Sequence, residues 1–251
     1  MRTPLIAGNW KMNGAWNASE ELLSRIAEIQ PRDVDVLVCP PFTLLASAAA
    51  HLAGTDIAWG AQNVYPAEKG AYTGEISVPM LAEMGCTYAI CGHSERRRLF
   101  GESDAFIHEK VKALFKAHMT PILCVGETAE ERAAGKTEDV IAREVTIGAD
   151  GLAADEAARL VIAYEPVWAI GKGQAATPAD AEAVCSYIRT LIEEKYGKTA
   201  ASLVRILYGG SVNESNISSL LREDDIDGAL IGGASLDGEE FSAIVEKAER
   251  N

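Results

Sequence analysis

The sequence is poor in the features that would assign it to a nucleic-acid-binding, membrane or secreted class. Positive charge is scarce, because 23 Lys and Arg stand against 37 Asp and Glu, for a formal net charge of -14. This balance argues against nucleic acid or an anionic membrane surface as a partner. No apolar run reaches the roughly 18 residues of a membrane span, and the run near the N-terminus is too short for a signal peptide.

Cysteine usage argues against a disulfide framework. The five cysteines are odd in number and scattered, with no CxxC pair. They predict reduced thiols, and we therefore expect a cytoplasmic protein. No two of the four histidines have the spacing of metal ligands, so neither a metal nor an organic cofactor is expected.

What the sequence does contain is a regular alternation of short apolar runs with longer amphipathic ones. Eight such strand and helix units follow one another without a linker, repeat or low-complexity segment. The pattern predicts one (β/α)₈ barrel, an α/β fold, with residues 1–251 as a single domain. The competing fold is a doubly wound open sheet, which usually carries GxGxxG after its first strand, and that motif is absent.

The stretch 160–176, LVIAYEPVWAIGKGQAA, joins a buried strand to a carboxylate and a glycine-containing loop. Glu165 ends the apolar run, where we expect it half shielded from water at the rim of a crevice. Pro166 restricts the backbone on both sides of that point. The stretch is typical of a base beneath a mobile cover, although a solvated loop with an incidental Glu fits the residue types alone about equally well.

In a barrel the chemistry lies at the carboxyl ends of the strands, and polar residues dominate these positions here. Two glycine pairs, in YGGS and IGGA, end the seventh and eighth predicted strands and would expose backbone N–H groups to a phosphate. Lys11 would bring a positive charge to the same rim. The strand-end residues that we expect in the site are Asn9, Lys11, His93, Ser94, Glu95, Glu165, Ser211, Gly232 and Gly233, with Gly171 added from the loop.

His93 differs from the other histidines because it is the only one at a predicted strand end. It lies just before SERRR, a predicted short helix. The dipole at that helix N-terminus disfavours the imidazolium and favours a neutral ring that donates to a substrate oxygen. A carboxylate base, a neutral electrophile, a lysine and a phosphate cradle together predict proton abstraction next to the carbonyl of a small phosphorylated sugar.

Eight motifs, in order along the whole chain, resemble those of the triosephosphate isomerase family. They are GNWKMN at 8–13, GAQN at 60–63, GAYTGE at 70–75, CGHSERR at 91–97, CVGE at 124–127, AYEPVWAIG at 163–171, YGGSV at 208–212 and IGGASL at 231–236. The resemblance implies interconversion of dihydroxyacetone phosphate and D-glyceraldehyde 3-phosphate through an enediolate, in glycolysis and gluconeogenesis, without a cofactor.

The resemblance also implies a role for individual residues. Glu165 would shuttle the proton between two carbons, and His93 would polarise the carbonyl and move protons between the oxygens. Lys11 and Asn9 would stabilise the oxyanion. Among supporting residues, Ser94 would hold Glu165 when the lid is open and Glu95 would pair with Lys11.

The resemblance further implies a homodimer. The loop over 64–76, with Tyr72, Thr73, Gly74 and Glu75 at its tip, would dock into a partner subunit. Arg96 would pair with Glu75 and tie this loop to the next one.

The sequence departs from the family pattern in the lid, where the family's GTGKTA is replaced by GKGQAA, placing Lys172 at the tip and Gln174 and Ala175 in the far hinge. Two rival functions stay open at this point. A pentose-phosphate epimerase would use the same barrel, but its usual metal-binding His and Asp at strand ends are missing. A phosphate-binding scaffold or adhesin without turnover is the non-enzymatic alternative.

Overall fold

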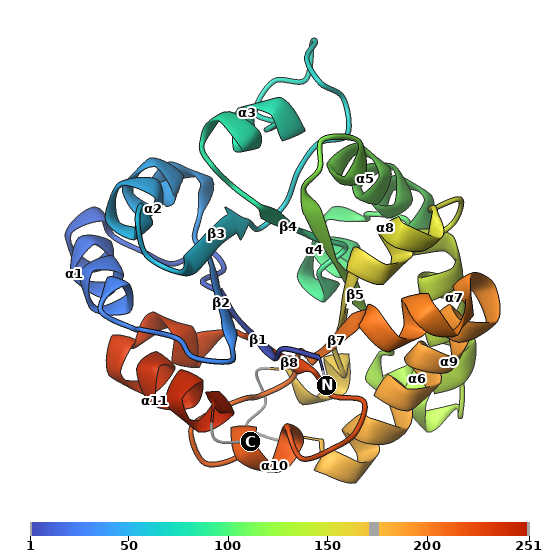
Figure 1. Ribbon diagram of the computed structural model, residues 1–251. Helices are drawn as coiled ribbons and strands as arrows, with labels where there is room; N and C mark the ends of the chain where they lie inside the picture. The colour runs from blue at the N-terminus through green and yellow to red at the C-terminus, as the bar shows by residue number, and fades with distance from the viewer. Residues whose placement is uncertain (1, 171–175, 250–251) are drawn as a thin grey trace.

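The computed structural model describes residues 2–170 and 176–249. Eight parallel strands form a closed barrel in chain order, and the helices surround it as an outer ring (Figure 1). The strands are β1 Leu5–Asn9, β2 Asp35–Cys39, β3 Ile57–Ala61, β4 Tyr88–Cys91, β5 Thr120–Val125, β6 Val161–Tyr164, β7 Arg205–Tyr208 and β8 Gly228–Ile231.

The barrel closes through its first strand, which pairs with the second and with the last. Leu5 of β1 stands opposite Asp35 of β2 on one side and opposite Gly228 of β8 on the other. Closure gives every strand a neighbour on both sides, so the sheet has no exposed edge. The predicted (β/α)₈ barrel is therefore confirmed, and the open doubly wound sheet is excluded.

Alternate residues along each strand belong to two separate cores, as the two-residue period of a strand requires. Ile6 faces the helices and joins the large core between barrel and helices. Its neighbours on β1 face inward. The inner core consists of Leu5, Ala7, Leu37, Cys39, Ile90, Ile122, Cys124, Val161, Ala163, Leu207 and Leu230.

The helices occupy the amphipathic segments between the strands. The first begins at Trp16 without a side-chain cap. The longest contains a break at Gly197, where φ is 85°. The α-helices are α1 Trp16–Ala27, α2 Leu45–Leu52, α3 Val78–Glu83, α4 Ser94–Phe100, α5 Asp104–Lys116, α6 Ala129–Ala133, α7 Thr137–Gly148, α8 Ala154–Arg159, α9 Pro178–Leu203, α10 Ile217–Leu220 and α11 Gly238–Glu249.

Three short 3₁₀ helices complete the described part of the fold, and each follows the carboxyl end of a strand. They are η1 Phe42–Leu44, η2 Val167–Ala169 and η3 Gly233–Leu236. Because η2 follows β6 and η3 follows β8, both belong to the rim where the polar strand-end residues lie. No helix within the described part of the chain is both long enough and apolar enough to cross a membrane.

Candidate active site

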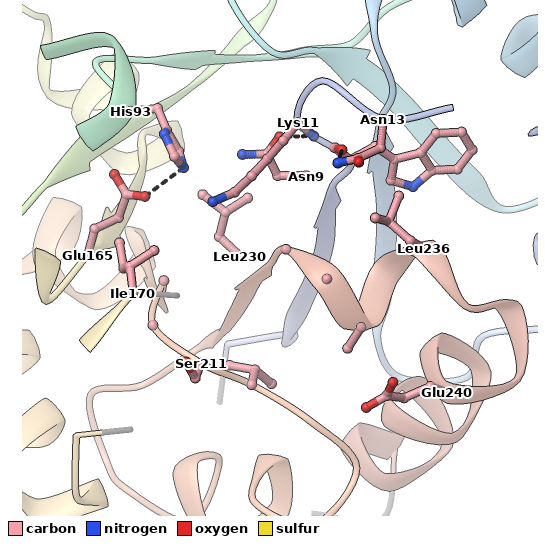
Figure 2. Close-up of a pocket in the computed structure, with 17 residues that line it drawn as sticks. Asn9, Lys11, Asn13, His93, Glu165, Ile170, Ser211, Leu230, Leu236 and Glu240 are labelled. Atoms are coloured by element: carbon pink, nitrogen blue, oxygen red, sulfur yellow. Dashed lines mark hydrogen bonds and ion pairs between the residues drawn. The ribbon is translucent and has the colours of Figure 1, made fainter. Parts of the chain in front are cut away.

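The carboxyl end of the barrel holds a cavity of about 410 Å³. Figure 2 shows the His93, Glu165 and Lys11 side chains turned toward one another in it, with Ser211 across the cavity. The residues that line it are Asn9, Trp10, Lys11, Asn13, His93, Glu165, Ile170, Gly209, Gly210, Ser211, Val212, Leu230, Gly232, Gly233, Ala234, Leu236 and Glu240. The fold thus gathers predicted residues from five separate strand ends into one site.

Glu165 directly follows the last residue of β6, lines this cavity and is only 2% exposed. Its Oε1 lies 2.8 Å from Nε2 of His93, and its Oε2 accepts a hydrogen bond of 2.8 Å from the backbone N–H of Ser94. The expectation of a half-shielded carboxylate was therefore wrong. The chain turns inward at the strand end, and the polar partners that this burial requires come from the β4 loop.

Two glycines leave room for the Glu165 backbone and side chain. A Cβ on Gly126 would stand 1.7 Å from the carbonyl oxygen of Glu165, and a Cβ on Gly209 would stand 2.9 Å from its Cγ. Neither position tolerates a larger residue without displacing Glu165. Gly126 after β5 therefore packs against the Glu165 backbone, and Gly209 after β7 packs against the Glu165 side chain.

His93 is the N-cap residue of α4, as predicted. Its Nδ1 accepts a hydrogen bond of 3.2 Å from the backbone N–H of Glu95. A nitrogen that accepts carries no hydrogen, so the ring is neutral with its hydrogen on Nε2, facing Glu165.

Burial and charge act in opposite directions on this pair. Burial lowers the pKa of His93, but the adjacent Glu165 carboxylate outweighs it and raises the pKa overall. Burial raises the pKa of Glu165, but His93, the Ser94 N–H and Lys11 together lower it overall. Glu165 is therefore an ionised base at neutral pH. The Glu165 carboxylate no longer raises the pKa of His93 once it turns to another partner.

Lys11 is held in an unusual backbone conformation at the end of β1, with φ of 53°. Its N–H donates to Oδ1 of Asn9 at 3.1 Å, and its carbonyl accepts from the Gln62 amide at 2.8 Å. Its Nζ lies 2.8 Å from Oε1 of Glu95. Side-chain contacts thus compensate the strained backbone and direct the ammonium into the cavity.

The far side of the cavity is formed by the loops after β7 and β8. Because η3 begins at Gly233, its first backbone N–H groups have no acceptor within the helix, and Gly233 and Ala234 line the cavity. A Cβ on Gly232 would lie 3.5 Å from Cε of Lys11, which places the lysine beside these amides. The Ser211 hydroxyl adds a further polar group and donates to the carbonyl of Ala169 at 3.2 Å.

Comparison with known proteins identifies the family. The family model described as "Triosephosphate isomerase" matches residues 4–248. A triosephosphate isomerase of Moorella thermoacetica is 51% identical over 249 residues, covering 98% of each chain. Those of Syntrophotalea carbinolica and Chloroflexus aurantiacus are 50% and 49% identical, over 98% of this chain and 98% and 99% of theirs.

The chain belongs to the triosephosphate isomerase family. The resemblance drawn from its eight motifs is thereby confirmed. The roles that the family motifs assign beyond the cavity lining, together with the residues that the sequence analysis missed, fall into four groups.

The first group lies outside the described residues. It comprises Gly171, predicted to bind substrate, and the three lid positions Lys172, Gln174 and Ala175. The residue that follows them is described. The backbone N–H of Ala176 donates to the Tyr208 hydroxyl at 3.0 Å.

The second group is the predicted interface loop, which protrudes from the barrel between β3 and α3 (Figure 1). Tyr72 is 44% exposed and packs its ring 4.4 Å from that of Tyr65. Thr73, Gly74 and Glu75 are exposed beside it, and all four lie apart from the cavity lining.

The third group is a pairing that the sequence interpretation got wrong. Nε of Arg96 lies 2.6 Å from Oε1 of Glu102, rather than against Glu75 as expected. The physical reason is the left-handed cap at Gly101, which turns the chain back beneath α4 and brings Glu102 under the guanidinium. Glu102 also receives the buried Lys110 ammonium at 2.6 Å.

The fourth group was missed. Gln62 holds the Lys11 backbone and appeared only within the GAQN motif at 60–63. Glu127, at 0% exposed, accepts from the Trp168 indole at 2.8 Å and from the Tyr164 hydroxyl, and so anchors the chain that follows Glu165. An acid directly after a buried strand, in CVGE, was the available signal.

Proposed function

We propose that this chain interconverts dihydroxyacetone phosphate and D-glyceraldehyde 3-phosphate, as glycolysis and gluconeogenesis require. The observation that carries the proposal is the buried Glu165 carboxylate, 2.8 Å from a neutral His93 and facing a cavity with Lys11 at its edge. These are the groups needed to remove a proton next to a carbonyl and to stabilise the anion that results.

The proton transfers follow from the positions of these groups. Glu165 takes a proton from C1 of dihydroxyacetone phosphate, and the electron pair moves onto the C2 oxygen, giving an enediolate. His93 donates its Nε2 hydrogen to that oxygen and recovers one from the C1 oxygen. Glu165 then returns its proton to C2, which leaves the aldehyde and restores both side chains.

Charge placement favours the enediolate over the substrate. The Lys11 ammonium and the Asn9 amide line the same edge of the cavity as His93. They would face the oxygens on which negative charge develops. Because the groups are held in place before the reaction, they stabilise that charge without having to reorganise.

The phosphate would bind at the other side of the cavity. The backbone amides of Gly232 and Gly233 would supply donors there, and the Ser211 hydroxyl would add one by exchanging the Ala169 carbonyl for the phosphate. This arrangement matches the phosphate sites that barrels commonly form after their last two strands. The remote phosphate would orient the triose so that C1 and C2 meet Glu165.

We further propose a cytosolic homodimer. Tyr72 at 44% exposed and Met12 at 96% exposed are large apolar side chains left in solvent by the monomer, on the first and third loops. Covering them with a second copy would bury this surface. The cytosolic location is supported by the five cysteines, which are all buried free thiols.

The function is tested by assaying isomerisation of D-glyceraldehyde 3-phosphate in the presence of chelator. The wild type should turn over rapidly, and Glu165→Ala should lose about 10³-fold or more in kcat. Glu109→Ala, an exposed acid on α5, serves as the matched control and should match the wild type. Binding of a phosphorylated substrate without turnover in the wild type would instead establish the scaffold.

A further inference from the structure

A second buried acid lies behind the site, on the helix that packs outside β5. Glu144 of α7 is 5% exposed, and no step of the proposed reaction uses it. Figure 1 shows α7 on the outer side of β5, away from the open cavity. A carboxylate so fully removed from water requires specific partners.

One oxygen of Glu144 contacts the strand end that supports the catalytic base. Its Oε2 accepts a hydrogen bond of 2.9 Å from the N–H of Gly126. Gly126 is in turn pressed against the Glu165 carbonyl, and the N–H of Glu165 donates to the Val125 carbonyl at 2.7 Å. Glu144 is therefore two contacts away from the backbone of the base.

The other oxygen of Glu144 faces Arg97, which joins two strand ends. Nη1 of Arg97 lies 3.4 Å from Oε1 of Glu144 and also pairs, more closely, with the Asp104 carboxylate of α5, so the two acids hold it together. Its Nε donates to the carbonyl of Gly92, directly before His93, at 2.8 Å, and its Nη2 donates to the carbonyl of Cys124 at 3.1 Å. One guanidinium thus fixes the end of β4 and the end of β5.

We propose that Glu144 is a positioning residue for the isomerisation, an inference that rests on the proposed function. In its ionised form it holds Gly126 behind Glu165. It also holds Arg97 in the orientation that ties the His93 strand end to the Glu165 strand end.

The charged groups around Glu144 shift its pKa, and that pKa sets the pH range in which Glu144 changes its charge. Arg97 of α4 and Arg143 of α7, with the Gly126 N–H, favour the ionised carboxylate, whereas Asp104 of α5 opposes it. Burial is the largest influence and raises the pKa of Glu144 to about 7. The ionised fraction therefore changes across the pH range in which the enzyme is assayed.

The test compares the kcat of the wild type with that of Glu144→Gln from about pH 5.5 to about pH 8.5. The glutamine keeps an acceptor for Gly126 and removes only the charge, so the ratio cancels the titration of Glu165 and His93. We expect a ratio of about tenfold at the alkaline end, falling toward one at the acid end, with KM unchanged. Glu138→Gln, an exposed acid on the same helix, should give a ratio of one throughout.

A second variant tests the route through Arg97. Arg97→Lys keeps the charge but loses the paired carbonyl contacts, so kcat should fall while KM stays the same. Adding Glu144→Gln to the Arg97→Lys variant should lower kcat by much less than adding it to the wild type. The two substitutions both act through the contact between Glu144 and Arg97.

Three outcomes would overturn the inference. They are a kcat ratio that is flat in pH, fully additive effects of the two substitutions, and a Glu144→Gln protein whose melting temperature falls markedly at alkaline pH. Absence of isomerisation in the wild type would instead refute the proposed function, so the two failures are distinguishable.

Discussion

The two ends of the barrel both contain buried ion pairs, and they differ in what lies next to them. At the amino end, Arg189 of α9 contacts Asp225 and Asp227, and Asp227 also accepts from the Ile206 N–H at 2.8 Å. At the carboxyl end, His93 and Glu165 face each other at a similarly short distance of 2.8 Å beside the cavity. The first arrangement is satisfied by protein groups and borders no described cavity-lining residue, whereas the second lines the cavity and can exchange partners with a substrate.

A short contact between charged groups therefore says little about its role until its surroundings are known. Arg205 makes the same point at the amino end, where it bridges Asp35 at the start of β2 and the Tyr88 hydroxyl at the start of β4. These groups connect three strands, and none of them lines the cavity. The comparison predicts that substitutions at the amino end change stability and those at the carboxyl end change turnover.

The largest expected effect is on stability at the amino end. Arg189→Met would leave Arg2 as the remaining cation beside Asp225 and the buried Asp227. It would also remove the hydrogen bonds from Arg189 to the carbonyls of Ala201 and Val204. The free energy of unfolding should fall by about 3–5 kcal/mol. Urea denaturation followed by circular dichroism measures this. Turnover per folded molecule should match the wild type, and a large loss of kcat in fully folded protein would contradict the comparison.

The next effect is on turnover at the carboxyl end. Glu165→Asp draws the carboxylate back by one methylene, and misplacement on this scale should cost about 10²-fold in kcat. The unfolding midpoint in urea should change little. A stable variant with near-normal kcat would show that the position of this carboxylate is not critical.

A smaller effect is expected on the phosphate side of the cavity. Ser211→Ala removes one donor, worth about 1 kcal/mol, and should raise KM about fivefold. Steady-state kinetics with D-glyceraldehyde 3-phosphate provide the measurement. An unchanged KM would place the phosphate elsewhere.

The smallest effect on turnover, at most about tenfold and confined to alkaline pH, concerns Glu144, whose titration also changes stability. Its folded-state pKa of about 7 lies above the ordinary value of 4.5, so its contribution to stability is present below that ordinary value and is lost as pH rises through 7. Relative to the wild type, Glu144→Gln should therefore gain stability between about pH 5 and about pH 7, by about 1.4 kcal/mol for each unit of the pKa shift and so about 3 kcal/mol in all. Melting temperatures across this range that keep a constant difference would exclude this titration.

Local sequence patterns predicted the barrel and the strand-end positions because each strand carries its own apolar run and its own polar end. The N-cap position of His93 was equally local, since it depends on the SERRR segment that follows. The family motifs then supplied roles for Glu165 and Lys11.

The errors and omissions share a different physical origin. The burial of Glu165 depends on Ser94, whereas the partner of Arg96 is set by the backbone turn at Gly101. Glu144 looks like any acid in an amphipathic helix, and its burial depends on how α7 meets β5. These features arise from packing between distant segments, which no local pattern records.

The central claim is that Glu165 removes a carbon-bound proton, and isotope transfer tests it most directly. Dihydroxyacetone phosphate is converted in heavy water, with the aldehyde product trapped as it forms and analysed by nuclear magnetic resonance. The account predicts deuterium at C2 of the product, because the proton on Glu165 can exchange with solvent before it returns. Complete retention of the substrate hydrogen in the product would point to direct hydride transfer and would contradict the account.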